Sequence, residues 1–245
     1  MLIKAVIFDL GETLFSYGEM DVNARFHEGA RLTYDYLNRQ NSTSGKLPAF
    51  PRYFRRHYLS IKWHYAWSNV LRREFDCLAL LDRKSRKMGF CLSDTQLEEL
   101  AWLWYKPLGD TASIEPDLLR TLQTLTDMSL RLAIISNTFL PASSLDQHLQ
   151  KFDLLKFFPV RVYSSDTVFR KPDKRIYQAA LGKIGVSAAH VMMVGDKQRE
   201  DIKGPARLGI RPVFKRGLLN QKTKVPVGVP VIENVSELPA LIEKV

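Results

Sequence analysis

The chain has 245 residues, 45% hydrophobic and 25% charged, with a formal net charge of +10, which suits a globular protein of one large or two smaller domains and excludes a chain too polar to bury a core. No apolar run approaches the roughly 18 residues of a membrane span, and the first residues lack the pattern of a signal peptide. The two cysteines, Cys77 and Cys91, lack the paired spacing of a zinc site and are compatible with a reducing compartment, so we expect a cytoplasmic protein with no membrane partner.

The first predicted element is a strand at residues 4–8. Helical patterns follow, with one helix at 22–37 and a second helical region at 52–87, where apolar residues recur at helical spacing. A further helix opens with the Ser-Asp-Thr-Gln run that starts at Ser93, which is typical of a capping box, and Pro107 closes it.

Strand and helix patterns alternate from about residue 111 onward. A helix begins near Pro116 and runs to about Met128. The remaining strand signals are at 131–135, 160–163, 191–194, 210–214 and 230–232, and the remaining helical stretches are at 142–151, 173–184 and 199–207. Such alternation predicts βαβ units and a parallel sheet.

These elements define an expected architecture. We expect an α/β fold with a doubly wound parallel sheet, built from residues 1–15 and 111–245. The residues between them, 16–110, are expected to form an all-helical domain inserted after the first strand.

Polar residues follow the predicted strands at the point where three of them end. Asp9 follows the first strand and Ser136 the second, while Asp196 follows the fourth, with Asp201 five residues further on and Lys171 in the interval. Because the carboxyl ends of parallel strands line one crevice, we expect these side chains to meet. Clustered carboxylates repel unless a cation neutralises them, and oxygen ligands without Cys or His suit Mg²⁺. The pattern predicts a Mg²⁺ site beside an anion site.

The same residues permit phosphoryl chemistry. A carboxylate such as Asp9 can act as a nucleophile and form an aspartyl-phosphate, which divides a difficult hydrolysis into two steps. Lys171 and the metal would stabilise the charge on the transferring oxygens. Ser136, with the backbone N–H groups of Asn137 and Thr138, would hold the remaining oxygens at the start of a helix.

Four short motifs carry these residues. They are Asp9-Leu10-Gly11-Glu12-Thr13, Ser136-Asn137-Thr138, Arg170-Lys171-Pro172-Asp173, and the run from Gly195 to Asp201 followed by Gly204 and Gly209. In this order and spacing they resemble the motifs of the haloacid dehalogenase (HAD) superfamily, in the IA-like branch whose helical C1 cap lies between the first two motifs. The resemblance implies a Rossmann-like core formed by residues 1–15 and 111–245, with residues 16–110 as the cap domain.

The resemblance also implies a role for each matching residue. Asp9 is implied as nucleophile and Mg²⁺ ligand, with the backbone carbonyl of Gly11 and the Asp196 carboxylate as further ligands. Asp201 is implied to bind the metal directly or through water. The remaining implied roles are that Ser136, Asn137 and Lys171 hold the phosphoryl group, Lys171 offsets the charge of Asp9, and Thr13 orients the first loop.

The first motif departs from the family pattern at Gly11. Family phosphatases usually carry a second Asp there, which protonates the leaving group, and general acid catalysis contributes about 10²–10⁴-fold. The side chain of the adjacent Glu12 is expected to point away from the site. The departure leaves several readings open: a substrate with a good leaving group such as an acyl phosphate, a proton donated by the cap or the substrate, a slow phosphatase, or a binder without catalysis.

Two other branches of the superfamily, the dehalogenases and the phosphonatases, also lack that Asp. Dehalogenases need no metal and lack the Gly-Asp pair that Gly195 and Asp196 form here, so the intact pair favours a Mg²⁺-dependent phosphoryl reaction. Phosphonatases use a cap lysine to form a Schiff base, for which Lys46 and Lys62 are candidates by location alone.

The stretch 52–87 is both basic and aromatic. Its ten Lys and Arg against three Asp and Glu give a local net charge of +7, ten minus three. Aromatic residues interleaved with basic ones can hold single-stranded nucleic acid, but such charge is more typical of a solvated helix face, so nucleic acid is not the expected partner. The helical spacing of Trp63, Trp67 and Val70 predicts the inner face of the cap.

We therefore predict a Mg²⁺-dependent phosphatase that hydrolyses a small phosphorylated metabolite through an aspartyl-phosphate at Asp9. The alternatives are a phosphonatase or dehalogenase of the same superfamily, and a weakly catalytic or non-catalytic binding protein. The sequence leaves the substrate and the oligomeric state open.

Overall fold

Six parallel strands form the centre of the molecule. The computed structural model describes residues 2–40 and 45–244, and within these ranges the sheet has the order β3-β2-β1-β4-β5-β6. The strands are β1 (Ala5–Phe8), β2 (Arg131–Ser136), β3 (Val160–Tyr163), β4 (Val191–Gly195), β5 (Arg211–Lys215) and β6 (Val231–Ile232). Every neighbouring pair is parallel, which confirms the predicted α/β fold, and each strand ends within one residue of its predicted bounds.

Both faces of the sheet are buried beneath helices, which explains why its central strands are continuous apolar runs. In β1, Val6 and Phe8 belong to one hydrophobic core and Ala5 and Ile7 to the other, and all four are fully buried. The first core includes residues of α5 (Leu118–Asp127), α6 (Ala142–Lys151) and α10 (Leu238–Glu243), and the second includes residues of α8 (Lys174–Ile184). Two short helices, α7 (Ser164–Thr167) and α9 (Gly204–Ala206), complete the sheet-bearing part.

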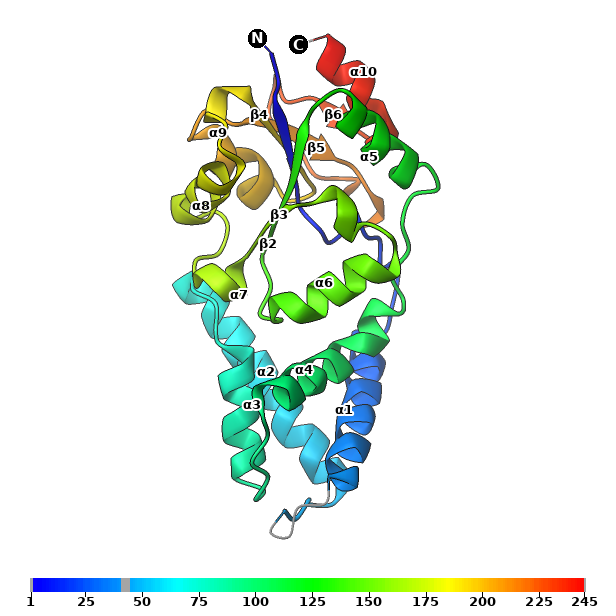
Figure 1. Cartoon of the computed structure of the whole chain (residues 1–245), viewed down its shortest axis with the longest axis vertical. Coiled ribbons are helices and arrows are strands. Elements are labelled where there is room, and N and C mark those ends of the chain that lie inside the picture. Colours follow the sequence, from blue (N-terminus) through cyan, green and yellow to red (C-terminus); the bar gives the residue numbers. More distant parts are fainter. Residues whose placement is uncertain (1, 41–44, 245) are drawn as a thin grey trace.

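Four helices lie between β1 and α5 in the chain. They are α1 (Val22–Arg39), α2 (Phe50–Leu71), α3 (Cys77–Arg86) and α4 (Asp94–Gly109). Their contact surfaces form a third core that includes Leu37, Tyr53, Leu100 and Trp104. The strands point their carboxyl ends toward this helical layer, whereas the two chain termini lie at the opposite end of the molecule (Figure 1). Ligands that bind at the carboxyl edge of the sheet therefore lie between the sheet and the helices.

Helix boundaries follow the predicted signals at most positions but not at Pro107. The capping box of α4 is confirmed, since Ser93 Oγ accepts from the Gln96 N–H and Gln96 returns the bond to the Ser93 N–H. Pro107 lies inside α4, which continues to Gly109, because the Asp110 N–H still reaches the Lys106 carbonyl at 2.7 Å. The predicted helix 199–207 is instead a π-helical turn, Gln198–Lys203, followed by α9.

The prediction that Trp63, Trp67 and Val70 form the inner face of the helical layer is wrong. These side chains are 59%, 44% and 70% exposed. The buried face of α2 carries Tyr53 and His57, whose polar groups are satisfied: the Tyr53 hydroxyl donates to Thr33 Oγ1 at 3.0 Å, and His57 Nδ1 lies 2.9 Å from the Tyr53 carbonyl. Satisfied polar aromatic groups can occupy a core, so apolar spacing alone did not identify the inner face.

No helix within the described ranges has the length and apolar character needed to cross a lipid bilayer.

Candidate active site

Three carboxylates meet at the carboxyl edge of the sheet. Asp9 follows β1, Asp196 follows β4, and Asp201 comes from the π-helical turn that succeeds it. Each offers an oxygen within 4.8 Å of the others, and the three residues are 3%, 9% and 0% exposed. The parallel register explains this convergence, because Phe8 pairs with Val194 and the next residues leave neighbouring strands side by side.

Lys171 is the cation at the centre of this cluster. Its Nζ donates to Asp9 Oδ1 at 2.8 Å, to Asp201 Oδ1 at 2.7 Å and to the Ile135 carbonyl at 3.0 Å, which uses all three N–H bonds. Asn137 fixes the backbone of Lys171 from both sides, since its Oδ1 accepts from the Lys171 N–H at 2.7 Å and its Nδ2 donates to the Lys171 carbonyl at 3.0 Å. The loop after β2 therefore positions the ammonium group.

Asp201 is held on both oxygens. Oδ1 accepts from Lys171, and Oδ2 accepts from the Lys197 N–H at 2.9 Å. The carboxylate fits against β4 only because residue 195 is glycine: a Cβ on Gly195 would lie 2.3 Å from Asp201 Cγ and 2.6 Å from Oδ2. Asp201 therefore contacts Lys171 through one oxygen and the backbone of the turn through the other.

The close approach at Gly195 leads to a testable expectation. Gly195→Ala should lower the free energy of unfolding by about 1–3 kcal/mol, the usual cost of overpacking, because the methyl group displaces the Asp201 carboxylate. Chemical denaturation measures this change. The matched control is Gly182→Ala, in α8, where nothing lies within 4 Å of an added Cβ and a gain of up to about 1 kcal/mol is expected. Equal effects at the two positions would contradict the packing argument.

The electrostatic environment separates the three acids. Burial raises the pKa of Asp9, but Lys171 and Lys197 outweigh it, so the net pKa of Asp9 is lowered and the group is ionised. Burial, with the nearby Asp9 charge, raises the pKa of Asp196 to about 8. Burial also raises the pKa of Asp201 to about 6, although Lys171 opposes the shift. The cluster thus contains one carboxylate whose charged form is favoured, Asp9, and two whose charged forms are disfavoured, Asp196 and Asp201.

The residues fit a hard divalent cation. Oδ1 of Asp196 is buried and has no hydrogen-bond partner among the described residues, although it faces two other carboxylates. A buried unpaired carboxylate oxygen is costly unless a cation meets it. All the side-chain donors are oxygens, which suits Mg²⁺ better than a softer metal. The backbone carbonyl of Gly11 lies in the loop that follows Asp9.

Ser136 and the loop after it differ in part from the predicted arrangement. Ser136 is the last residue of β2 and is buried at the same edge of the sheet. The Thr138 N–H, however, donates to Ser164 Oγ at 2.8 Å, so it is not free to hold a phosphoryl oxygen as predicted. The side chain of Asn137 is engaged with the Lys171 backbone, which leaves only its own backbone N–H for that role.

Sequence reasoning missed a buried polar network that joins the helical layer to the site. Ser164, the first residue of α7, donates to Glu74 Oε2 at 2.7 Å, and Arg170 Nη1 also donates to that oxygen. Glu74 lies between α2 and α3, and its side chain is 1% exposed. The only local signal was that Glu74 is one of three acids within the basic stretch 52–87. Arg170 immediately precedes Lys171, so this network ties the helices to the central cation.

The first loop directs Glu12 away from the acids. Glu12 adopts φ 57, and its Oε1 accepts from the Tyr17 N–H at 3.2 Å. Thr13 is buried, and its hydroxyl has no partner among the described residues. The ring of Tyr17 lies 3.9 Å from the position that a Cβ on Gly11 would occupy. No carboxyl group therefore stands where a second acid of the first motif would be.

Comparison with known proteins agrees with this geometry. The family model described as haloacid dehalogenase-like hydrolase matches residues 3–209. The glyceraldehyde 3-phosphate phosphatase of Methanothermobacter thermautotrophicus is 29% identical over 255 residues, covering 98% of this chain and 100% of that protein. The haloacid dehalogenase-like hydrolase domain-containing protein 3 of Danio rerio is 32% identical over 124 residues, which is half of each chain.

A solved structure shows the same fold over its full length. The 2-haloacid dehalogenase of Pseudomonas syringae pv. Tomato DC3000 has a TM-score of 0.62 and 22% identity, and the match covers 99% of both chains. At this identity the likeness concerns the fold alone. The family match over residues 3–209, together with four motifs assembled at one sheet edge, shows that the chain belongs to the haloacid dehalogenase-like hydrolases.

Proposed function

We propose that the protein is a Mg²⁺-dependent phosphatase that hydrolyses a small phosphorylated compound through an aspartyl-phosphate at Asp9. The observation that carries the proposal is the buried acid cluster, in which Asp9 is kept ionised beside Lys171 while Asp196 Oδ1 lacks a partner. Relatives named as phosphatases of glyceraldehyde 3-phosphate support a phosphoryl reaction.

The chain's own groups account for the two chemical steps. One Asp9 oxygen attacks phosphorus, and the bond from phosphorus to the leaving oxygen breaks with its electron pair on that oxygen. Water then attacks the aspartyl-phosphate, which releases phosphate and restores Asp9. Lys171 keeps Asp9 ionised and would face the negative charge of the phosphoryl group. Ser136 and the Asn137 N–H would hold the phosphoryl oxygens.

Asp9, Asp196 and the carbonyl of Gly11 would hold Mg²⁺, with Asp201 acting through water because both of its oxygens are already engaged. When bound, the ion neutralises negative charge on the phosphoryl oxygens.

Residues 16–110 are proposed as a cap over this site, and residues 1–15 and 111–245 as the core. The Glu74 network and the position of α1–α4 at the carboxyl edge of the sheet support this division (Figure 1). Of the two candidate lysines for the phosphonatase alternative, Lys62 lines a cavity near the candidate active site and Lys46 does not. The Lys46 N–H bonds to Met88 beyond the end of α3, and the exposed Lys62 holds its Nζ 5.2 Å from the ring centre of Tyr58.

Phosphate release from para-nitrophenyl phosphate and acetyl phosphate, with and without Mg²⁺, tests the proposed function. Metal-dependent turnover is expected. Halide release from 2-haloacids without metal, or borohydride trapping of a Schiff base with a phosphonate substrate, would instead support the other branches of the superfamily.

Metal binding should also be visible in stability. Adding Mg²⁺ at about 100 times its Kd should stabilise the protein by about 2.7 kcal/mol, measured by thermal unfolding, and Asp196→Asn should abolish this gain.

Because the pKa of Asp196 is raised to about 8, protons compete with the ion, so Mg²⁺ should bind more weakly at pH 6 than at pH 8. Without metal, this raised pKa stabilises the fold at low pH, and the contribution is lost as pH rises from about 4 to about 8. A Mg²⁺ effect retained in Asp196→Asn would contradict the assignment.

A further inference from the structure

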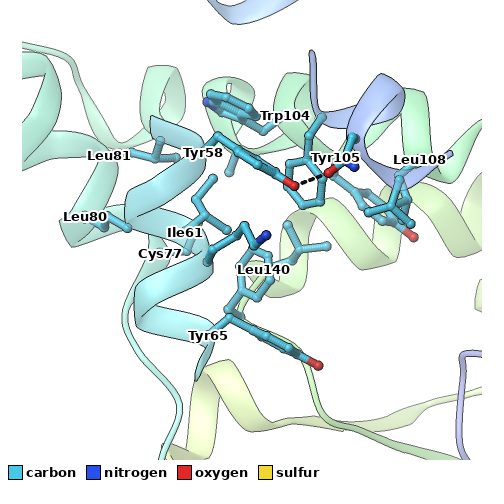
Figure 2. Close-up of a pocket in the computed structure, with 16 residues that line it drawn as sticks. Tyr58, Ile61, Tyr65, Cys77, Leu80, Leu81, Trp104, Tyr105, Leu108 and Leu140 are labelled. Carbon is cyan, nitrogen blue, oxygen red and sulfur yellow. Dashed lines mark hydrogen bonds between the residues drawn. The ribbon is translucent and has the colours of Figure 1, made fainter. Parts of the chain in front are cut away.

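A cavity of about 560 Å³ lies between the four helices of the insert and the loop after β2 (Figure 2). Aliphatic and aromatic side chains form most of its wall, among them Phe26, Ile61, Leu80, Leu81, Trp104 and Leu140. Asn23 and Tyr58 also line it, but they hydrogen-bond to each other. No described residue that lines the cavity is acidic, and Lys62 is its only lining cation. This volume and lining are typical of a site for a largely apolar small molecule.

Three residues of the cavity wall lie near the candidate active site. Tyr105 lines the cavity, and its hydroxyl lies 3.0 Å from that of Tyr17, whose ring lies beside Gly11. Phe139 also lines the cavity and directly follows the Ser136–Thr138 motif.

The third of these wall residues is Tyr65. Its ring centre lies 5.4 Å from the guanidinium of Arg170, the neighbour of Lys171. These three residues place one part of the cavity wall beside the candidate active site.

The first loop restricts which leaving groups the site can release. Glu12 is turned back toward the Tyr17 N–H, and Gly11 has no side chain to donate a proton. The ring of Tyr17, and no carboxyl group, lies within 4 Å of the position that a Cβ on Gly11 would occupy. A phenol, with a pKa of about 10, departs as its anion far more readily than an alkoxide does.

We propose that the protein acts on aryl phosphates, with the phosphate at Asp9 and an aromatic group of about two rings in the apolar cavity. This inference rests on the proposed phosphatase function and narrows its substrate. The bond from Asp9 oxygen to phosphorus forms as the bond from phosphorus to the aryl oxygen breaks, and the phenolate leaves with the electron pair and takes a proton from water. The aromatic lining, including Phe26, Trp104 and Phe139, offers edge and face contacts to such rings.

The test compares kcat/KM, with Mg²⁺, for 2-naphthyl phosphate, phenyl phosphate, acetyl phosphate and glyceraldehyde 3-phosphate. Phenol and 2-naphthol are of similar acidity. The ratio of kcat/KM between their phosphate esters therefore reports binding in the cavity and not the ease with which the leaving group departs. The naphthyl ester should exceed the phenyl ester by about tenfold, because a second ring buries further apolar surface. Its kcat/KM should exceed that of glyceraldehyde 3-phosphate by about 100-fold or more, because glyceraldehyde 3-phosphate has an alkoxide leaving group.

A pair of variants on α2 localises the effect. Ile61→Gln places a polar group on the cavity wall and should lower kcat/KM for the naphthyl ester about tenfold, with a smaller change for acetyl phosphate. Leu59→Gln is the matched control, because Leu59 is 57% exposed on the same helix and does not line the cavity. Binding of 2-naphthylmethylphosphonate, which cannot release its aryl group, provides a readout without turnover: it should change tryptophan emission through Trp104 and weaken in Ile61→Gln.

The outcomes distinguish failure of the aryl phosphate assignment from failure of the proposed phosphatase function. Equal or faster turnover of glyceraldehyde 3-phosphate, or an Ile61→Gln variant that matches Leu59→Gln, would overturn the aryl phosphate assignment and leave the proposed phosphatase function standing. Absence of phosphate release from every ester would overturn both.

Discussion

Replacing Asp9 by asparagine should reduce Mg²⁺-dependent phosphate release by on the order of 10⁴-fold or more, the range seen when one member of a catalytic unit is removed. The amide cannot form the covalent intermediate, although it keeps an oxygen that can accept the bond from Lys171 Nζ. Phosphate release from para-nitrophenyl phosphate at saturating Mg²⁺ measures the loss. The fold should persist, because only the charge of one buried group changes.

The matched control for this substitution is Asp127→Asn, at the exposed end of α5, where the side chain contacts only Gln123 among the hydrogen bonds of the structure. Its turnover should equal that of the parent protein. An Asp9→Asn protein that folds and still releases phosphate within tenfold of the parent rate would rule out Asp9 as the nucleophile.

Lys171→Met should both abolish turnover and lower the free energy of unfolding by about 3–5 kcal/mol, the usual cost of breaking a buried ion pair. Lys171 Nζ is the shared donor to Asp9 and Asp201, and all three side chains are at most 4% exposed. Without the ammonium, the two carboxylates face each other in a buried site, which raises their pKa values. Stability conferred by raised carboxylate pKa values is lost as pH rises, so the variant should be least stable, relative to the parent, at alkaline pH.

Two further proteins make this result specific. Lys174→Met removes an exposed lysine at the start of α8 and should change neither stability nor turnover by a measurable amount. The double variant Lys171→Met with Asp201→Asn should recover part of the stability, because one buried charge is removed, but no turnover. Recovery of turnover would show that Lys171 acts only as a structural counter-ion. Urea denaturation across pH 5–8, together with the phosphate assay, distinguishes these results.

The sequence predicts this fold well where local pattern and tertiary structure coincide. Apolar runs that end in Asp9, Ser136 and Asp196 identify buried parallel strands, because side chains at their carboxyl ends must share one edge. The Ser93 capping box is equally local, since both partners lie within four residues. Elements governed by such short-range rules were predicted within one or two residues.

Prediction failed where the deciding contacts are distant in sequence. The partner of the Thr138 N–H is Ser164, and the partner of Ser164 is Glu74, 90 residues away, which no periodicity reveals. The exposure of Trp63 and Trp67 has the same origin, because Tyr53 and His57 bury the opposite face of α2 against helices whose placement the sequence does not specify. The sequence predicted which carboxylates converge, but it did not predict the hydrogen bonds through Glu74 that join the site to the helices.

The aromatic composition of the insert has a practical consequence. All four tryptophans of the chain lie in α2 and α4, and none lies in the sheet or in the helices that cover it. Trp102 packs into the core that the insert shares with the sheet, whereas Trp63 and Trp67 face solvent. Tryptophan fluorescence therefore reports the insert and its junction with the sheet, whereas the proposed Mg²⁺ site would report the sheet edge. Following both signals in one denaturation experiment shows directly whether the two parts of this molecule unfold together or in sequence.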